Sequence, residues 1–271
     1  MKKVLLSLSV LLAGLSLGSC SQTNWEIDED ATKIVVAASP TPHSEILEVC
    51  VPLMEELGYE LEIREFTDYV QPNMVTENGD VQANFFQHTP YLDEFNELNG
   101  THLVSVGKIH YEPFGIYAGK SSSIENLPAG SKIVVPNDGT NEARALLLLE
   151  QVGLIDLKDG VGLTATKLDV ENSNGYQIIE SEAAAIAGQR PDAELVVLNG
   201  NYAIGAGLTV SDAIATEDAE GIAAQTYGNI LVVRDGNQNK PIVQALYNCL
   251  TSETVKTYIE EQYSGSVVPL F

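Results

Sequence analysis

The stretch Asn84-Phe85-Phe86-Gln87-His88-Thr89-Pro90-Tyr91 marks the point where a buried strand gives way to a helix. Ala83 to Phe86 is typical of the end of a buried strand, and Pro90 suits the first turn of a helix, where its missing N–H needs no partner. Gln87 and His88 are therefore expected on a strand-to-helix turn, the edge at which open α/β sheets bind ligands. Phe86, His88 and Tyr91 then indicate a small molecule with an apolar and a polar part. The alternative is that the phenylalanines are core residues and His88 only caps the helix.

The first 19 residues are typical of an export signal. Lys2 and Lys3 precede an apolar run, Val4 to Leu17, that is too short to span a membrane. Leu17-Gly18-Ser19-Cys20 resembles the lipobox of bacterial lipoproteins, in which the cysteine is acylated and becomes the new N-terminus. We therefore expect a protein lipid-anchored at Cys20 to the cell membrane, on its extracytoplasmic side. An ordinary secretory signal with a chance cysteine is the alternative.

Residues 20–32 are polar and acidic without periodicity, and we interpret them as a flexible tether. The formal charge of the chain is −24, and removal of Lys2 and Lys3 would take it to −26. This charge argues against nucleic acid as a partner, because phosphate contacts need Lys and Arg. It also argues against electrostatic docking on anionic lipid. Cys50 and Cys249 lie in apolar helical patterns, which predicts two buried free thiols; a disulfide is the alternative in an exported protein.

Two series of alternating strands and helices predict an α/β fold in two lobes. The first series begins at the apolar run Lys33 to Ala38 and the second at Lys132 to Pro136. Further strands are expected over 61–65, 83–86, 103–106, 113–118, 175–180, 194–198 and 227–234, and helices over 46–57, 90–98, 142–152, 181–188, 241–250 and 252–263. Pro52 implies a kink or a break in its helix. Two crossings between the lobes are expected, near 113–118 and 229–233.

Arg144 lies in the first turn of the predicted helix 142–152, where a cation opposes the helix dipole. A cation without local support indicates an anionic partner, and the carboxylate of a ligand is one candidate. A solvated surface arginine is the alternative.

Patterns typical of catalysis do not occur in the sequence. His43, His88, His102 and His110 are scattered and do not form H-E-x-x-H or a metal spacing with cysteine. The chain has no G-x-S-x-G, G-x-G-x-x-G or Walker pattern. We therefore expect neither an enzyme nor a cofactor or metal.

Several polar motifs follow predicted strands in one order along the chain. They are Phe66-Thr67-Asp68-Tyr69-Val70-Gln71-Pro72-Asn73, Asn84-Phe85-Phe86-Gln87-His88, Pro136-Asn137-Asp138 with Thr140-Asn141, Arg144-Ala145-Leu146-Leu147-Leu148-Leu149, and Asn199-Gly200-Asn201-Tyr202-Ala203. With the lipobox, they resemble the methionine-binding lipoproteins of ABC importers, the NlpA/MetQ type. The resemblance runs from about Lys33 to the C-terminus.

This resemblance implies a two-lobed periplasmic-binding-protein-like (type II) fold with two interlobe crossovers. Lobe 1 would comprise residues 33–115 and 230–271, and lobe 2 residues 116–229. The function it implies is delivery of L-methionine, or a related small molecule, to an ABC transporter permease and ATPase. The ligand-binding residues that it implies are Tyr69, Phe86, His88, Tyr91, Arg144, Asn201 and Asn229.

The physical chemistry of these side chains suits a free amino acid. Arg144 can hold a carboxylate bidentately, asparagine carbonyls and tyrosine faces can hold an ammonium, and Phe86 with the tyrosines suits a thioether. No acidic residue is assigned to the ammonium.

Two positions depart from the family pattern. Gly139 stands where we expect proline, and Glu142 adds a carboxylate that could compete for Arg144. The residues leave open L- or D-methionine, its sulfoxide, another amino acid and a small dipeptide. A lipoprotein of the same fold acting in adhesion or signalling is the alternative.

Overall fold

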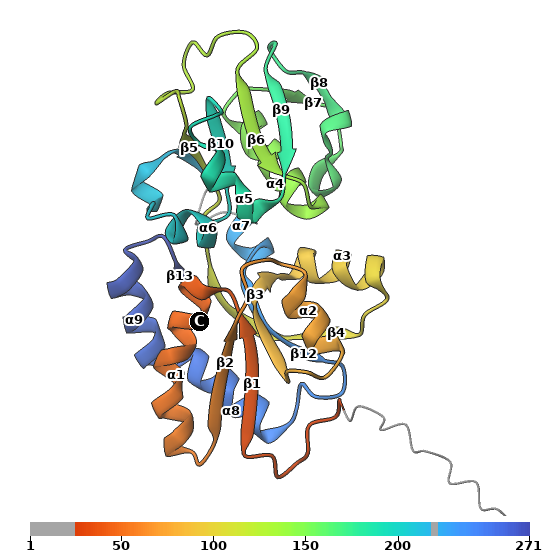
Figure 1. The fold of residues 1–271 in the computed structure, drawn as a ribbon, viewed down its shortest axis with the longest axis vertical. Helices are drawn as coiled ribbons and strands as arrows, with labels where there is room; N and C mark the ends of the chain where they lie inside the picture. The colour runs from red at the N-terminus through yellow and green to blue at the C-terminus, as the bar shows by residue number, and fades with distance from the viewer. Residues whose placement is uncertain (1–24, 218–221) are drawn as a thin grey trace, which may run out of the picture.

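The computed structural model describes residues 25–217 and 222–271, and the description below refers to these residues. Two β-sheets, each with helices packed on it, lie one above the other and are joined by the chain segments between them (Figure 1). The predicted signal peptide 1–19 and Cys20 lie outside the described residues. Within them, helices that are both long and apolar enough to cross a membrane do not occur.

The first sheet has the strand order β13-β4-β12-β3-β1-β2. Its strands are β1 (Lys33–Ala38), β2 (Glu60–Glu65), β3 (Ala83–His88), β4 (Leu103–Tyr111), β12 (Asn229–Arg234) and β13 (Val268–Pro269). β1 lies parallel to both β2 and β3, whereas β12 runs antiparallel to its neighbours β3 and β4. The central strands are apolar and buried on both faces, as covered parallel strands require.

Helices cover both faces of this sheet. They are α1 (Glu45–Glu56), α2 (Gln71–Glu77), α3 (Thr89–Asn99), α8 (Pro241–Leu250) and α9 (Glu253–Tyr263). Ile46 of α1 and Leu246 of α8 pack with Val36 and Phe85 in the larger core. On the other face, Leu92 of α3 packs in a second cluster of buried side chains. Burial of these apolar side chains is the main stabilising term for the lobe.

The second sheet has the order β11-β5-β10-β6-β9. Its strands are β5 (Gly115–Ala118), β6 (Lys132–Pro136), β9 (Gln177–Ser181), β10 (Leu195–Leu198) and β11 (Ala213–Thr216), with the small ladder β7 (Asp156–Leu157) and β8 (Val170–Asn172) beside it. Its helices are α4 (Gly139–Gln151), α5 (Ala183–Ile186) and α6 (Gly200–Gly205). The short helix α7 (Ile222–Thr226) lies in the second crossing segment, where Ala224 packs with Tyr111 at the end of β4. The leucines of α4 pack against Ile133 and Val197 in the core of this lobe.

The chain passes between the sheets twice. It leaves the first sheet after Tyr111 and enters the second at Gly115, and it leaves the second after Thr216 and re-enters the first at Asn229. In the first sheet, Asn229 pairs with His88 on one side and His110 on the other. The two crossing segments therefore lie side by side at the edge of the first sheet that faces the second. The predicted lobe boundaries, after residues 115 and 229, come after the first residue of β5 and the first residue of β12.

Residues 25–31 differ from the expected flexible tether, because they pack on the first lobe. The Ile27 N–H donates to Asn237 Oδ1 at 2.9 Å, and Asn237 Nδ2 donates to the Trp25 carbonyl at 3.0 Å. The guanidinium of Arg234 lies 4.6 Å from the centre of the Trp25 ring, and Ile27 is buried. The prediction of a tether over 20–32 is therefore wrong for this N-terminal segment.

Three other local expectations have clear outcomes. β3 continues through His88, so Gln87 and His88 end the strand rather than lie on a turn after it. α1 runs unbroken through Pro52, which rules out the predicted break. Cys50 and Cys249 are buried free thiols, which confirms the prediction made for them.

Candidate ligand-binding site

A narrow pocket lies between the two sheets and holds about 340 Å³ of space not filled by protein atoms. The pocket is lined by Tyr69, Phe86, Gln87, His88, Tyr91, Glu112, Asn141, Arg144, Asn199, Gly200, Asn201 and Asn229. The structure thus brings all seven residues of the predicted ligand-binding set to one cavity. Residues that line it but were not in the set include Glu112 and Asn141.

One wall of the pocket is aromatic. Phe86 comes from β3, Tyr91 from the first turn of α3, and Tyr69 from the loop after β2. The ring centre of Tyr69 lies 5.8 Å from those of both Phe86 and Tyr91. The Tyr91 hydroxyl donates to the Tyr69 carbonyl at 2.9 Å, which fixes the two tyrosines relative to each other. This preformed apolar surface suits a thioether or another apolar side chain.

His88 caps α3 and also faces the pocket. Its Nδ1 accepts the backbone N–H of Tyr91 at 3.2 Å, so Nε2 carries the proton of the neutral ring. That Nε2 lies 3.3 Å from Asn141 Oδ1 in the second lobe. Burial, with Arg144 nearby, lowers the pKa of His88 to about 3. His88 therefore both caps α3 and lines the pocket.

Direct hydrogen bonds join the two lobes around the pocket. The Tyr69 hydroxyl donates to Asn201 Oδ1 at 2.6 Å, and the Tyr202 hydroxyl donates to the Thr67 carbonyl at 3.0 Å. Near the start of α4, the Thr140 N–H donates to Glu94 of α3 at 3.3 Å. These contacts draw the lobes together and narrow the access to the pocket.

Gly139 lies directly against the side chain of Glu94 from the first lobe. A Cβ at this position would lie 2.1 Å from a carboxylate oxygen of Glu94. The absence of a side chain leaves room for the Glu94 carboxylate beside the start of α4, whose N-cap is Asp138. The glycine that departs from the family pattern is therefore matched by Glu94 across the cleft.

Arg144 is buried and paired with an anionic partner from the chain itself, which rules out the alternative of a solvated surface arginine. Its Nε lies 2.8 Å and its Nη2 2.6 Å from the two carboxylate oxygens of Glu217, and Nη2 also donates to the Glu112 carbonyl at 3.0 Å. Its guanidinium carbon lies 4.2 Å from the ring centre of Tyr227. Burial alone would lower the pKa of Arg144, but Glu217 raises it above the ordinary value.

The competing carboxylate is therefore Glu217 and not Glu142. Glu142 Oε1 instead accepts the backbone N–H of Lys167 at 2.7 Å. In the part of the chain that the structure describes, the hydrogen bonds of Arg144 use Nε and Nη2. Nη1 takes no part in these three hydrogen bonds.

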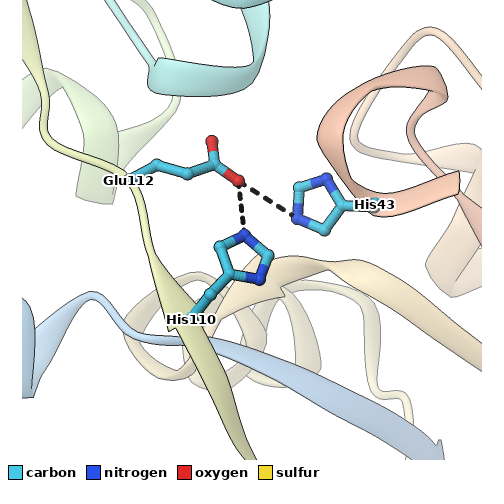
Figure 2. Close-up of side chains that lie close together, drawn as sticks. All are labelled: His43, His110 and Glu112. Carbon is cyan, nitrogen blue, oxygen red and sulfur yellow. Dashed lines mark hydrogen bonds and ion pairs between the residues drawn. The ribbon is translucent and has the colours of Figure 1, made fainter. Parts of the chain in front are cut away.

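Glu112 supplies a buried carboxylate to the pocket. It follows β4 in the first crossing segment and is 5% exposed. Its Oε1 lies 2.7 Å from His110 Nε2 and 3.4 Å from His43 Nε2, as Figure 2 shows. Its Oε2 lies on the other side, where a Cβ on Gly200 would come within 3.0 Å of it. Burial raises the pKa of Glu112, and His43, the Asn201 N–H and Arg144 each act to lower it.

Sequence reasoning missed both acidic residues of the site. The chain contains 38 acidic residues, and neither Glu112 nor Glu217 lies in a motif that separates it from the others. One usable signal was present for Glu112, because it directly precedes 113–118, where a crossing between the lobes was expected. Glu217 has no such signal, since its partner Arg144 is 73 residues away.

Comparison with known proteins places this architecture in a family. Residues 34–271 match the family model described as NlpA lipoprotein. Over 276 residues the chain is 35% identical to the methionine-binding lipoprotein MetQ of Bacillus subtilis, covering 100% of this chain and 99% of the relative.

Solved structures agree with this match. Lipoprotein Tp32 from Treponema pallidum is 39% identical with a TM-score of 0.82, covering 88% of this chain and 98% of that one. A nutrient binding protein from Burkholderia cenocepacia, solved bound to methionine, is 39% identical with a TM-score of 0.83, covering 88% and 100%. The two-lobed α/β chain described here belongs to the NlpA lipoprotein family.

Proposed function

We propose that this protein binds methionine, or a close derivative, between its lobes and delivers it to an ABC importer. The observation that carries the proposal is the composition of one pocket, in which a buried cation, a buried carboxylate and an aromatic wall meet. A free amino acid with an apolar side chain presents the three complementary groups. The relatives support the choice of methionine, since one is named for binding it and another was solved with it.

Each part of the ligand has a partner in this proposal. The carboxylate lies near Nη1 of Arg144 and the N-terminal end of α4, where the helix dipole favours negative charge. The ammonium lies between Oε2 of Glu112 and the amide oxygens of the pocket asparagines. The thioether packs on Phe86, Tyr69 and Tyr91, since sulfur makes favourable contacts with aromatic rings. This assignment supplies the acidic partner that the sequence reading lacked.

The proposed role is binding without chemical conversion, and the proposed partners are a membrane-embedded permease and its ATPase. Lipidation at Cys20 would hold the protein at the extracytoplasmic face of the cell membrane, because acyl chains bury methylene groups in the bilayer. Replacement of Cys20 by Ala should abolish labelling with a fatty-acid analogue and release exported protein from the membrane fraction. Retention of both the label and the membrane association would contradict the anchor.

The ligand is tested by identifying what the protein carries. Protein purified from cells is denatured, and the released small molecules are identified by mass spectrometry. Calorimetric titration of the refolded, ligand-free protein then compares L-methionine, D-methionine, methionine sulfoxide, Gly-Met and alanine. We expect methionine or a close derivative to be released and to bind much more tightly than alanine. Equal binding of all amino acids, or no binding of any, would overturn the proposal and favour an adhesion or signalling role.

A further inference from the structure

Two buried histidines lie directly behind Glu112 in the first lobe. His43 comes from the turn 40–44 after β1, and His110 lies near the end of β4; both are at most 1% exposed. Figure 2 shows their Nε2 atoms aimed at the same carboxylate oxygen, while the second oxygen turns away from both rings. The histidines therefore contact Glu112 from the side opposite Gly200 and the pocket.

The contacts define which nitrogen of each ring carries the proton. His110 Nε2 faces the Glu112 carboxylate at 2.7 Å, and His43 Nε2 faces Asn229 Oδ1 at 2.9 Å as well as Glu112. Carboxylate and carbonyl oxygens are acceptors, so both Nε2 atoms must be donors. Both rings are neutral, because burial lowers the pKa of His43 to about 4 and that of His110 to about 3. Each Nδ1 is then unprotonated.

The orientation of the two rings is fixed by packing. The side chain of Phe85 meets His43 edge-on with ring centres 4.8 Å apart, and meets His110 edge-on at 5.3 Å. The two imidazoles lie 5.0 Å from each other. Because Phe85 is fully buried in β3, the rings cannot turn away from the carboxylate without disturbing the core.

The same three residues have the composition of a zinc site, and their ligating atoms lie within 4.8 Å of one another. The outer nitrogens argue against a metal. A histidine bound to a metal through Nε2 carries its proton on Nδ1 and almost always donates it to an acceptor. Within residues 25–217 and 222–271, Nδ1 of His43 and Nδ1 of His110 are buried without a hydrogen-bond partner. Metal binding would turn these two acceptors into buried N–H groups without an acceptor, which is the arrangement that metal-bound histidines avoid.

We propose that His110 is a positioning residue, which donates to Oε1 of Glu112 so that Oε2 faces the ammonium group of the ligand. His43 supports this arrangement by packing beside the same oxygen while its Nε2–H donates to Asn229 Oδ1. This proposal rests on the proposed function. It attributes the protein's preference for a ligand with an ammonium group to residues behind the pocket wall. Neutrality of the histidines is essential to it. A neutral imidazole donates a hydrogen bond without cancelling the charge of Glu112, whereas an imidazolium would pair with the carboxylate and repel the ligand ammonium.

The test compares two ligands that differ only in the amine. L-Methionine and 4-(methylthio)butanoate share the thioether and the carboxylate, and the second lacks the ammonium. Both are titrated into the parent protein, His110→Phe and His110→Gln. Phenylalanine keeps a ring against Phe85 but has no donor, whereas the glutamine amide can place a donor near the position of Nε2. His102→Phe is the matched control, because His102 is an exposed histidine paired with a different carboxylate, Glu77.

The parent should prefer methionine over the deaminated ligand by roughly 30-fold or more, the effect of losing one partner of a buried charge pair. His110→Phe should reduce this preference at least 10-fold while the affinity for the deaminated ligand changes less than 3-fold. His110→Gln should restore most of the preference, and His102→Phe should leave it unchanged. Equal weakening of both ligands in His110→Phe would show a merely structural role and overturn the proposal. Failure of the parent to bind methionine is a separate result, and it would overturn the proposed function together with this inference.

A second measurement covers the case in which His110→Phe does not fold. Nitrogen-15 NMR of the parent protein at pH 7 should show both His43 and His110 neutral, with the proton on Nε2. Elemental analysis should find no stoichiometric zinc after incubation with zinc and desalting. A proton on Nδ1, a charged ring, or one retained zinc ion per chain would overturn the proposal.

Discussion

The guanidinium of Arg144 in α4 is bound by the carboxylate of Glu217, which lies where the chain leaves the second sheet. Glu217 also accepts the Tyr111 hydroxyl at 2.9 Å and the Phe114 N–H at 3.3 Å. One carboxylate thus links the proposed ligand anchor to both crossing segments. The cation of the cleft therefore has a structural role in addition to any role in binding.

This pair predicts two separable effects of changing Arg144. Arg144→Ala should weaken methionine binding by about 2–5 kcal/mol, or roughly 30-fold to several thousandfold. It should also lower the free energy of unfolding by about 3–5 kcal/mol, because Glu217 is left buried without its partner. Calorimetric titration and urea denaturation measure the two effects.

The double variant Arg144→Met with Glu217→Gln separates these roles. Removal of both charges should recover most of the stability, since a buried ion pair can be replaced by groups of similar volume at little cost. Methionine affinity should stay low, because the guanidinium is still missing. A double variant that regains affinity, or a single variant that is as stable as the parent, would contradict the assignment.

The N-terminal segment 25–31 should contribute to the stability of the first lobe. Asn237→Ala removes both the acceptor for Ile27 N–H and the donor to the Trp25 carbonyl. The loss should be about 1–3 kcal/mol of unfolding free energy, the usual cost of leaving a buried polar group unsatisfied. Urea denaturation of protein starting at Trp25 measures it, with the exposed Asn239→Ala as control. Equal midpoints for the two variants would mean that the segment adds no stability.

Acid should destabilise the fold through the buried histidines. Burial lowers the pKa of His43 to about 4 and those of His88 and His110 to about 3, from an ordinary value of 6.5. Between these values the unfolded chain binds protons that the folded chain does not, so stability falls as the pH drops below about 6.5. Each histidine contributes up to about 1.4 kcal/mol per pH unit. The raised pKa of Glu112 acts in the opposite direction.

Urea denaturation at pH 7, 6 and 5 tests this dependence. The free energy of unfolding of the parent should fall from pH 7 to pH 5. In His110→Gln it should fall less steeply, because one fewer proton binds on unfolding. His102→Gln is the matched control, because it also removes one histidine but at an exposed position. A parent whose stability does not change from pH 7 to pH 5 would contradict the buried neutral histidines.

Much of the fold could be predicted from the sequence because its strands are short, continuous and apolar. The runs at Lys33 to Ala38 and Lys132 to Pro136 became β1 and β6 with the predicted bounds. The helix predicted over 90–98 became α3, which runs one residue further at each end and has Gly100 as its C-cap. Phe86, His88 and Tyr91 were indicated by their place at the end of a strand, whereas the full set of pocket residues came from the family resemblance.

The parts that escaped prediction depend on contacts between distant residues. Arg144 looked unsupported because its counter-charge lies on the far crossing segment, and nothing local to Glu217 reveals the pairing. The N-terminal segment looked like a polar linker because its partners, Arg234 and Asn237, lie more than 200 residues away. His43 and His110 looked scattered for the same reason, since only the fold brings them to Glu112.

The most direct test of the account is the position of a bound ligand. Protein containing ordinary methionine is freed of ligand and crystallised with L-selenomethionine, so that the ligand carries the only selenium. The anomalous difference map should show one strong peak beside the rings of Phe86, Tyr69 and Tyr91, with the ligand carboxylate toward Arg144 and its amine toward Glu112. A peak elsewhere on the molecule, a ligand with its carboxylate and amine exchanged, or no peak at saturating concentration would contradict it.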